Sequence, residues 1–336
     1  MVEPRHALVL LVGTVLLATT GGAEQPAPVE RPLATLGSVV LRESDFERFT
    51  MAAFSAEQVA RIRIQPDARQ EAIDAWLDLR VQAAKARKDG IDQRATFQKA
   101  LELMDMKLLV RSMIDRNRPR LTKPADVPAA EIAQYYHAHP ERFQVPPGSG
   151  ANGRQPLDEV RIEIAKQVAR ERNSRFHRTF LADLRAEMGF RQTNEAHPEA
   201  SLLDTNAVPA ETTIAFIDAT PLTEADFRWF LKDAYRAEQR QQAFSQPSAR
   251  RRMLADFLNM RLMAAKATKL GLDKTKPHRA ALELAELRLL AEFLLERDGM
   301  TPWKVPGANE EERAKAFRRY LDRLRAEVDL TRIALP

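Results

Sequence analysis

The segment LRESDFERF at Leu41–Phe49 recurs as LTEADFRWF at Leu222–Phe230, 181 positions further along the chain. The same offset, without a gap, aligns the ALEL at Ala100–Leu103 with the ALEL at Ala281–Leu284. Matches in separate blocks at one constant offset are typical of a duplicated structural unit and are hard to obtain by chance. The sequence therefore predicts that one helical unit occurs twice.

Each copy is predicted to begin with a β-hairpin and to continue with amphipathic helices. Residues Ala34–Leu41 and Thr212–Leu222 carry turn residues between apolar pieces, which is typical of a hairpin. Ser44 and Thr223 are the expected N-caps of the helix that follows each hairpin. Apolar periodicity with Pro and Gly boundaries predicts further helices at 66–89, 94–115, 128–139, 157–188, 224–241, 247–270, 277–297 and 309–328.

The copies also share the motif of their closing helices. LADLRAE at Leu181–Glu187 returns as LDRLRAE at Leu321–Glu327, now at an offset of 140, so the second copy is shorter. We expect a mainly α protein of two homologous modules at 33–190 and 212–333, joined by a polar linker at 191–211. The apolar tail after each closing helix is expected to add a strand to the hairpin of its own module.

The N-terminus resembles a secretory signal. Arg5 and His6 precede the apolar run Ala7–Thr19, and small residues at Gly21–Ala23 suit cleavage, so we expect a signal peptide at 1–23 and a Pro-rich lead-in at 24–32. The run is short of the roughly 20 apolar residues of a membrane helix. Membrane attachment is therefore expected only through an uncleaved signal. The chain has no Cys, which excludes disulfides, thiol catalysis and cysteine-ligated metals.

Charge and motifs give no indication of catalysis or cofactors. The 52 basic and 47 acidic residues leave a net charge of +5, but they are interleaved, which indicates solvated helix faces and not a nucleic-acid-binding surface. His137 and His139 are two positions apart, so on a helix they point in opposing directions and cannot chelate one metal ion. No Gly-rich phosphate loop occurs. We expect no catalytic residue, no metal and no cofactor.

Four segments carry a family resemblance. They are the hairpin with LRESDFERF, RQEAIDAWLDLRVQAAKARKDGI at Arg69–Ile91, EIAQYYHAHPERFQVP at Glu131–Pro146, and DEVRIEIAKQVARERNSRFHRTFLADLRAEM at Asp158–Met188. In this order they resemble the SurA-like, PpiC-type periplasmic foldases. The resemblance implies a chaperone domain built from helices of both chain ends, with a parvulin prolyl isomerase domain inserted after the Tyr-Tyr…Phe segment.

The chain departs from that family at the insertion point. It has only VPPGSGANGRQP at Val145–Pro156, which is too short to form a parvulin domain, so no isomerase residue can be carried over. We therefore expect a periplasmic chaperone that binds extended apolar segments of unfolded exported proteins. A dedicated assembly or scaffold subunit with one fixed protein partner is an alternative. A prolyl isomerase, by family membership, is another.

Candidate client-binding residues follow from the repeat and from methionine content. Trp229 occupies the position of Arg48 in the first copy, between the apolar Phe227 and Phe230, and is expected to point away from the core, toward a contact surface or into edge packing between the two modules. Five methionines could line an adaptable groove. They are Met104, Met106, Met113, Met260 and Met263. Core filling is the alternative role for these methionines.

Overall fold

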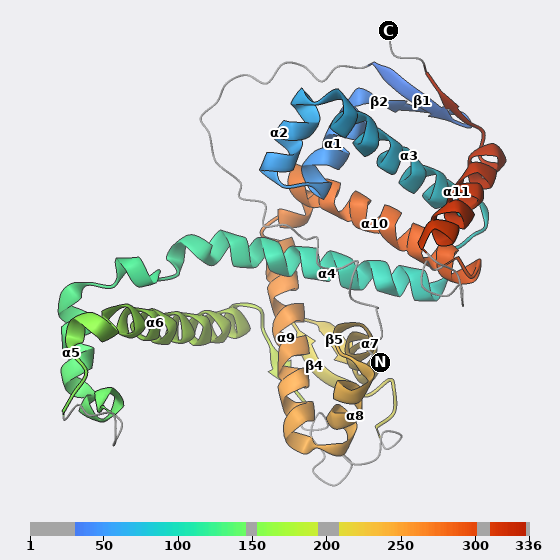
Figure 1. Ribbon diagram of the computed structural model, residues 1–336. Coiled ribbons are helices and arrows are strands. Elements are labelled where there is room, and N and C mark those ends of the chain that lie inside the picture. The colour runs from blue at the N-terminus through green and yellow to red at the C-terminus, as the bar shows by residue number, and fades with distance from the viewer. Residues whose placement is uncertain (1–30, 146–152, 194–207, 301–309, 334–336) are drawn as a thin grey trace. The chain divides into compact units, whose positions relative to one another are not determined.

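The chain folds into two units that are mainly helical, as predicted, each with one small antiparallel sheet (Figure 1). The computed structural model describes residues 31–145, 153–193, 208–300 and 310–333. Unit 1 contains the residues up to Leu108 and those from Asp273 onward, and unit 2 contains Leu109–Leu272. The predicted signal peptide and most of the lead-in lie outside the described residues. None of the described helices combines the length and apolar character needed to cross a bilayer.

Unit 1 joins the beginning of the chain to its end. Its elements are β1 (Pro32–Leu36), β2 (Val39–Arg42), α1 (Glu43–Ala53), α2 (Ala56–Ile64), α3 (Pro66–Lys88), the first part of α4 (Ala95–Asn117), α10 (Lys276–Arg297), α11 (Glu310–Glu327) and β6 (Leu330–Arg332). The strands lie in the order β2-β1-β6. The two-residue turn of the hairpin begins at Gly37, whose φ of 55° suits the first position of a type II′ turn.

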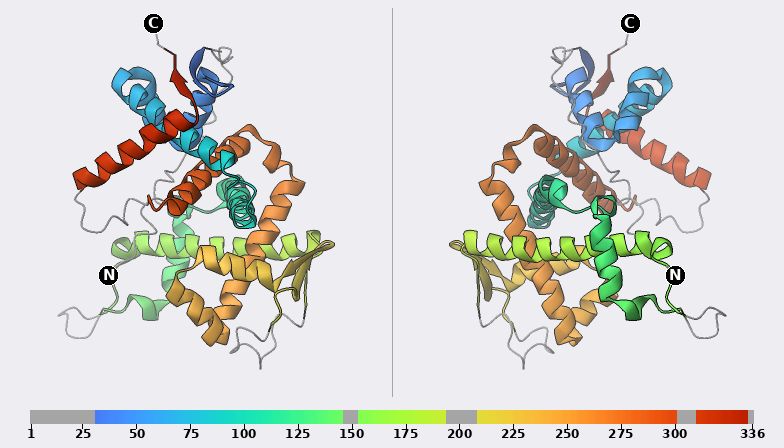
Figure 2. Two further views of the ribbon diagram at one scale, coloured as in Figure 1. Left: turned by 90° about the vertical axis from the view of Figure 1, so that its right-hand side faces the viewer. Right: turned by 90° about the vertical axis from the view of Figure 1, so that its left-hand side faces the viewer.

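Unit 2 is built from the middle of the chain. Its elements are the rest of α4, η1 (Arg118–Arg120), η2 (Pro124–Asp126), α5 (Ala129–Ala138), η3 (Pro140–Phe143), α6 (Leu157–Glu187), β3 (Arg191–Gln192), β4 (Thr213–Ile217), β5 (Thr220–Thr223), α7 (Glu224–Ala234), α8 (Ala237–Ser245) and α9 (Pro247–Lys269). The short η5 (Leu272–Lys274) lies where the units meet in sequence. Figure 2 shows α6 as one continuous helix, with the sheet β3-β4-β5 near one end.

The closing strands of the two repeats are exchanged. β3, which follows the first closing helix, pairs with β4 of the second hairpin, and the C-terminal β6 pairs with β1 of the first. The closing helices behave alike, because α6 contacts α9 in unit 2 and α11 packs on α3 in unit 1. The compact units therefore differ from the predicted modules 33–190 and 212–333. Part of the linker predicted at 191–211 is β3.

Chain connectivity supplies a physical reason for this exchange. β3 and β4 are close along the chain, whereas β1 lies far upstream, and the entropy lost on loop closure grows with loop length. Summed over both loops, the free-energy cost of loop closure is about 1 kcal/mol lower for the exchanged pairing than for pairing of each closing strand with the hairpin of its own repeat. Once β3 occupies the open edge of β4, β6 is left with the open edge of β1.

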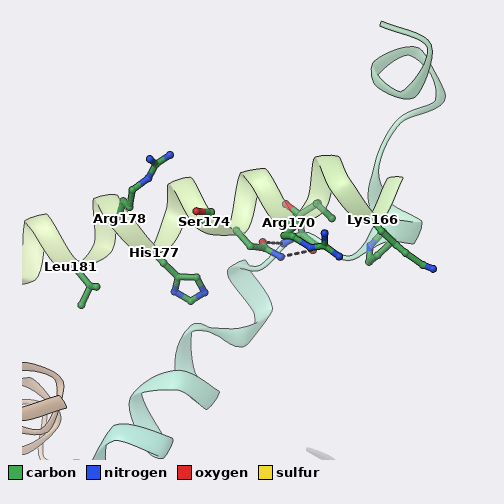
Figure 3. Close-up of a pocket in the computed structure, with 10 residues that line it drawn as sticks. Lys166, Arg170, Ser174, His177, Arg178 and Leu181 are labelled. Carbon is green, nitrogen blue, oxygen red and sulfur yellow. Dashed lines mark hydrogen bonds between the residues drawn. The ribbon is translucent and has the colours of Figure 1, made fainter. Parts of the chain in front are cut away.

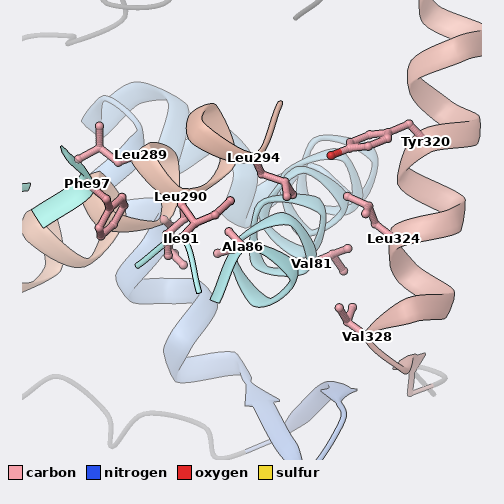
Figure 4. Packing of buried hydrophobic residues seen from close by; sticks show 12 residues of the cluster. Val81, Ala86, Ile91, Phe97, Leu289, Leu290, Leu294, Tyr320, Leu324 and Val328 are labelled. Atoms are coloured by element: carbon pink, nitrogen blue, oxygen red, sulfur yellow. The ribbon is translucent and has the colours of Figure 1, made fainter. Parts of the chain in front are cut away.

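One core cluster of unit 1 forms where α3, α10 and α11 meet (Figure 4), and another lies under the hairpin around Phe46 and Trp76. Val81 of α3 and Leu294 of α10 are fully buried, and Leu324 of α11 is 1% exposed. Figure 4 shows Leu324 and Tyr320 directed from α11 toward the other two helices. Full burial of such side chains contributes roughly 1.5–3 kcal/mol each. The C-terminal helix is thus an integral part of the unit that holds the first hairpin.

An ion pair made by a buried glutamate recurs at equivalent positions of the two repeats. Glu224, at the start of α7, accepts hydrogen bonds from Arg250 Nη2 at 2.7 Å and from Arg228 Nε at 3.1 Å. Glu43, 181 positions earlier, pairs with Arg69 in the same way. Each pair joins the first helix after the hairpin to the long helix that Pro66 or Pro247 begins.

Two details of the helix predictions need correction. The predicted N-cap Ser44 is wrong, because α1 begins at Glu43 and the N–H of Arg42 donates to the Asp45 carboxylate at 2.8 Å. Thr223 is confirmed as the N-cap of α7. The single helix predicted at 224–241 is two helices, which separate at Tyr235.

Candidate functional site

The first hairpin presents an open strand edge. The strand order β2-β1-β6 leaves β2 at the edge, and Val39 and Val40 are 57% and 40% exposed. Pairs across an antiparallel hairpin alternate, and the pair Leu36–Val39 that closes the two-residue turn is hydrogen-bonded. The next pair, Thr35–Val40, is then non-hydrogen-bonded, so the N–H and C=O of Val40 point away from β1. Such an edge can accept another extended strand.

Hydrogen bonds on the other side of β1 agree with this register. Gly37 N–H donates to Asp329 O at 3.2 Å, and Ile333 N–H donates to Leu33 O at 3.0 Å. Odd-numbered residues of β1 therefore face β6, and even-numbered residues face β2. The orientation of the Val40 backbone is thus set by the pairing of β1 on both sides.

A groove of about 410 Å³ lies beside this edge, and we call it the hairpin groove. It is lined by Leu36, Val39, Leu41, Arg80, Ala84, Arg87, Lys88, Glu327, Val328 and Asp329. Two of its cations are neutralised by α10, since Arg80 pairs with Glu283 and Arg87 with Glu286, each at 2.6 Å. The groove therefore offers apolar contact with little net charge.

The equivalent edge in unit 2 is blocked. The register of the second hairpin places Pro221 of β5 opposite Phe216, where the first hairpin has Val40 opposite Thr35. Proline has no N–H to donate to an added strand. The repeat thus has one edge that can donate a hydrogen bond at this position and one that cannot.

Unit 2 contains a second and larger groove, of about 650 Å³, which we call the α6 groove (Figure 3). It is lined by Thr122, Pro124, Lys166, Ala169, Arg170, Asn173, Ser174, His177, Arg178 and Leu181. One wall is a stripe along α6, and the other is the segment before η2. Asn173 joins the walls, because its side-chain amide accepts from Thr122 N–H at 2.8 Å and donates to Thr122 O at 3.0 Å.

The structure does not gather the predicted client-binding residues in either groove. Met106 and Met113 are 3% and 2% exposed, so they fill the core and do not line an open groove. Met104, Met260 and Met263 are half-buried. Trp229 is also half-buried, and Lys232 Nζ lies 5.1 Å from the centre of its ring.

The described residues contain no cluster of three or more His, Cys, Asp or Glu side chains that could hold a metal ion. His137 is exposed, and His139 lies at the end of α5 with its ring 4.3 Å from that of Tyr135. Another histidine, His278, is buried near the start of α10. The Nε2 atom of His278 lies 2.8 Å from Asp105 Oδ1, and the side chain is 2% exposed. The pair joins α4 to α10, next to the N-cap Thr275 whose hydroxyl accepts from His278 N–H at 3.4 Å.

The flanks of the short segment at Val145–Pro156 pair directly with each other. Gln144 forms a β-bridge with Arg154, and Gln155 N–H donates to Phe143 O at 2.8 Å. The Arg154 guanidinium lies 3.4 Å from the centre of the Tyr136 ring, and the Tyr136 hydroxyl donates to Gln155 O at 2.6 Å. Local contacts therefore close the chain at the point where the resemblance would place an isomerase domain.

The sequence holds signals for parts of both grooves. The contrast between Val40 and Pro221 can be read from the repeat offset, and Lys166, Arg170 and His177 share one helical face by spacing alone. The wall at Thr122 has no such signal, because it depends on a contact 51 residues away. In comparisons with family models, curated proteins and solved structures, no match to the chain was found.

Proposed function

We propose that the protein is a chaperone that holds extended segments of unfolded exported proteins in the periplasm, without catalysing prolyl isomerisation. The observation that carries the proposal is the open edge of β2 beside the hairpin groove. An unfolded chain has unpaired N–H and C=O groups along its length, whereas a folded protein pairs most of these groups internally. An open strand edge distinguishes the two by strand addition.

Binding would use the main chain for affinity and the groove for selectivity. An added strand would exchange hydrogen bonds with Val40, and its neighbouring side chains would point to the two faces of the sheet in alternation. Those on the face of Leu36, Val39 and Leu41 would enter the hairpin groove, which favours apolar side chains. Few hydrogen bonds give modest affinity, so the client leaves when its own folding withdraws the segment.

The closure at Gln144 and Arg154 argues against the isomerase alternative. The nine residues 145–153 between Gln144 and Arg154 are too few for a further domain. A protease-coupled proline peptide assay is expected to show only the uncatalysed rate, on the order of tens to hundreds of seconds. Turnover at catalytic amounts of protein would refute this part of the proposal.

The decisive variant is Val40→Pro. It removes the outward N–H from β2, and the second repeat already accommodates proline at the equivalent position of its hairpin. We expect an unchanged melting temperature and weaker binding of a fluorescein-labelled Val/Thr peptide, by roughly 2–10-fold for one hydrogen bond. Pro221→Val is the matched control, because it adds an N–H at β5 and should not lower binding.

A second arm tests the breadth of recognition. Unrelated unfolded proteins should compete with the labelled peptide, and the same peptide with N-methylated backbone nitrogens should bind weakly. Equal binding by wild type and Val40→Pro would refute strand addition. A failure of unrelated unfolded chains to compete would refute a general chaperone and would favour one dedicated partner.

A further inference from the structure

The α6 groove differs from the hairpin groove in its charge. Its lining contains three cationic side chains and one histidine, and no carboxylate. Arg170 donates to the neutral Gln167 side chain at 3.2 Å. Among the described residues, neither Arg170 nor Arg178 has a carboxylate within ion-pair distance, while Lys166 lies 3.6 Å from the exposed Glu163. This groove therefore attracts a negatively charged ligand.

The cations follow the direction of the groove. Lys166, Arg170 and His177 lie within about 40° of one another around α6, and the first two are separated by about 6 Å along the helix axis. Carboxylates two residues apart in an extended chain are about 6.7 Å apart and point to the same side. Figure 3 shows His177 and Leu181 on one side of α6 and Arg178 on the other, so Arg178 lies at the outer rim.

The neutral part of the lining favours a polypeptide over a polyphosphate. Leu181 and Pro124 in the lining offer apolar contact beside the cations. A nucleic acid or polyphosphate would bind through many phosphate contacts, and its affinity would rise with the number of cations alone. An extended segment in which acidic and apolar residues alternate would satisfy both kinds of contact.

We propose that the α6 groove binds acidic extended segments of polypeptide, as a second client site on unit 2. The inference rests on the proposed function, since its ligand is a stretch of unfolded client. The α6 groove adds a preference for acidic segments, which strand addition at β2 does not supply.

The test compares charge reversals on two faces of the same helix. The double variant Lys166→Glu with Arg170→Glu, which we call the groove variant, reverses two positive charges in the α6 groove. Arg175→Glu reverses the charge of an exposed arginine about 180° away around α6. The probe is a fluorescein-labelled Glu/Leu peptide, with a Lys/Leu peptide as its charge control, titrated against the full-length protein. We expect the groove variant to weaken Glu/Leu binding roughly tenfold, and Arg175→Glu to change it less than about twofold.

The outcomes separate this proposal from the strand-addition proposal. Val40→Pro should leave Glu/Leu binding through the α6 groove intact, and the groove variant should leave binding of the Val/Thr peptide intact. Equal loss in the groove variant and in Arg175→Glu would overturn the proposal, because it would indicate a general effect of net charge. Tighter binding of inorganic polyphosphate or of phosphatidylglycerol vesicles than of the Glu/Leu peptide, lost in the groove variant, would also overturn it.

Discussion

Leu324→Ala and Leu184→Ala test the exchange of closing elements between the repeats. Both leucines occupy the same place in the LxxLRAE motif, at an offset of 140, and are 1% and 3% exposed. Leu324 belongs to the core cluster of unit 1, whereas Leu184 lies on α6 in unit 2. Each variant should therefore destabilise the unit that contains the hairpin of the other repeat.

The size of the effect follows from burial. Removing the outer carbons of a buried leucine loses about 2.4 kcal/mol of transfer free energy, and the cavity left behind brings the total to about 3–4 kcal/mol. That loss raises the population of the opened unit by roughly 100–1000-fold. Hydrogen exchange followed by mass spectrometry resolves the location, because peptides covering 32–42 and 213–223 report on the two hairpins separately.

We expect Leu324→Ala to lower protection at 32–42, and Leu184→Ala to lower protection at 213–223. Val81→Ala is a control within α3 that should affect 32–42 like Leu324→Ala. The opposite pattern, in which Leu184→Ala deprotects 32–42 and Leu324→Ala deprotects 213–223, would show that each repeat closes on itself. The reasoning from strand pairing would then be refuted.

Three further predictions concern single side chains. Glu224→Gln leaves Arg250 buried without a counter-charge, so it should lower the free energy of unfolding by about 3–5 kcal/mol in denaturant titrations. A denaturation midpoint like that of wild type would contradict this. Burial, reinforced by the hydrogen bond to Asp298, raises the pKa of Tyr320 above its ordinary value near 10, so the unfolded chain loses this proton first. The stability of unit 1 should therefore fall as the pH rises above about 10, and Tyr320→Phe should flatten that slope in urea titrations between about pH 8 and 11; parallel slopes would contradict it. Trp229 lines neither groove, so Trp229→Ala should leave binding of the Val/Thr and Glu/Leu peptides unchanged; a loss of about 1–2 kcal/mol in the binding of either peptide would make Trp229 a client contact and contradict the assignment of the sites.

The local elements were largely predictable from the sequence. Pro66 and Gly90 bound α3, and the apolar stripe through Trp76 and Val81 is buried as its periodicity predicts. The break between α7 and α8 was missed because the residues at Tyr235 include neither Gly nor Pro. The N-cap of α1 was placed at Ser44 because its side chain suits a cap, although the repeat offset from Thr223 points to Arg42.

The candidate site was predictable only in part. The difference between Val40 and Pro221 is present in the sequence, but its meaning depends on strand order, which decides that β2 and β5 are edges. The methionine hypothesis relied on residue type, and residue type does not distinguish Met106 in the core from a residue in an open groove. The α6 groove required the contact between Asn173 and Thr122.

By itself, the sequence determined the helices, the hairpins and the duplication, because periodicity, turn residues and a constant offset are local properties of the chain. Only the tertiary structure decided which closing strand completes which hairpin. The two hairpins are copies of one another, so β1 and β4 both offer a free backbone edge to a closing strand, and the repeat alone does not say which strand pairs with which. The choice depends on loop closure and on the packing of α6 and α11, which are properties of the whole folded chain.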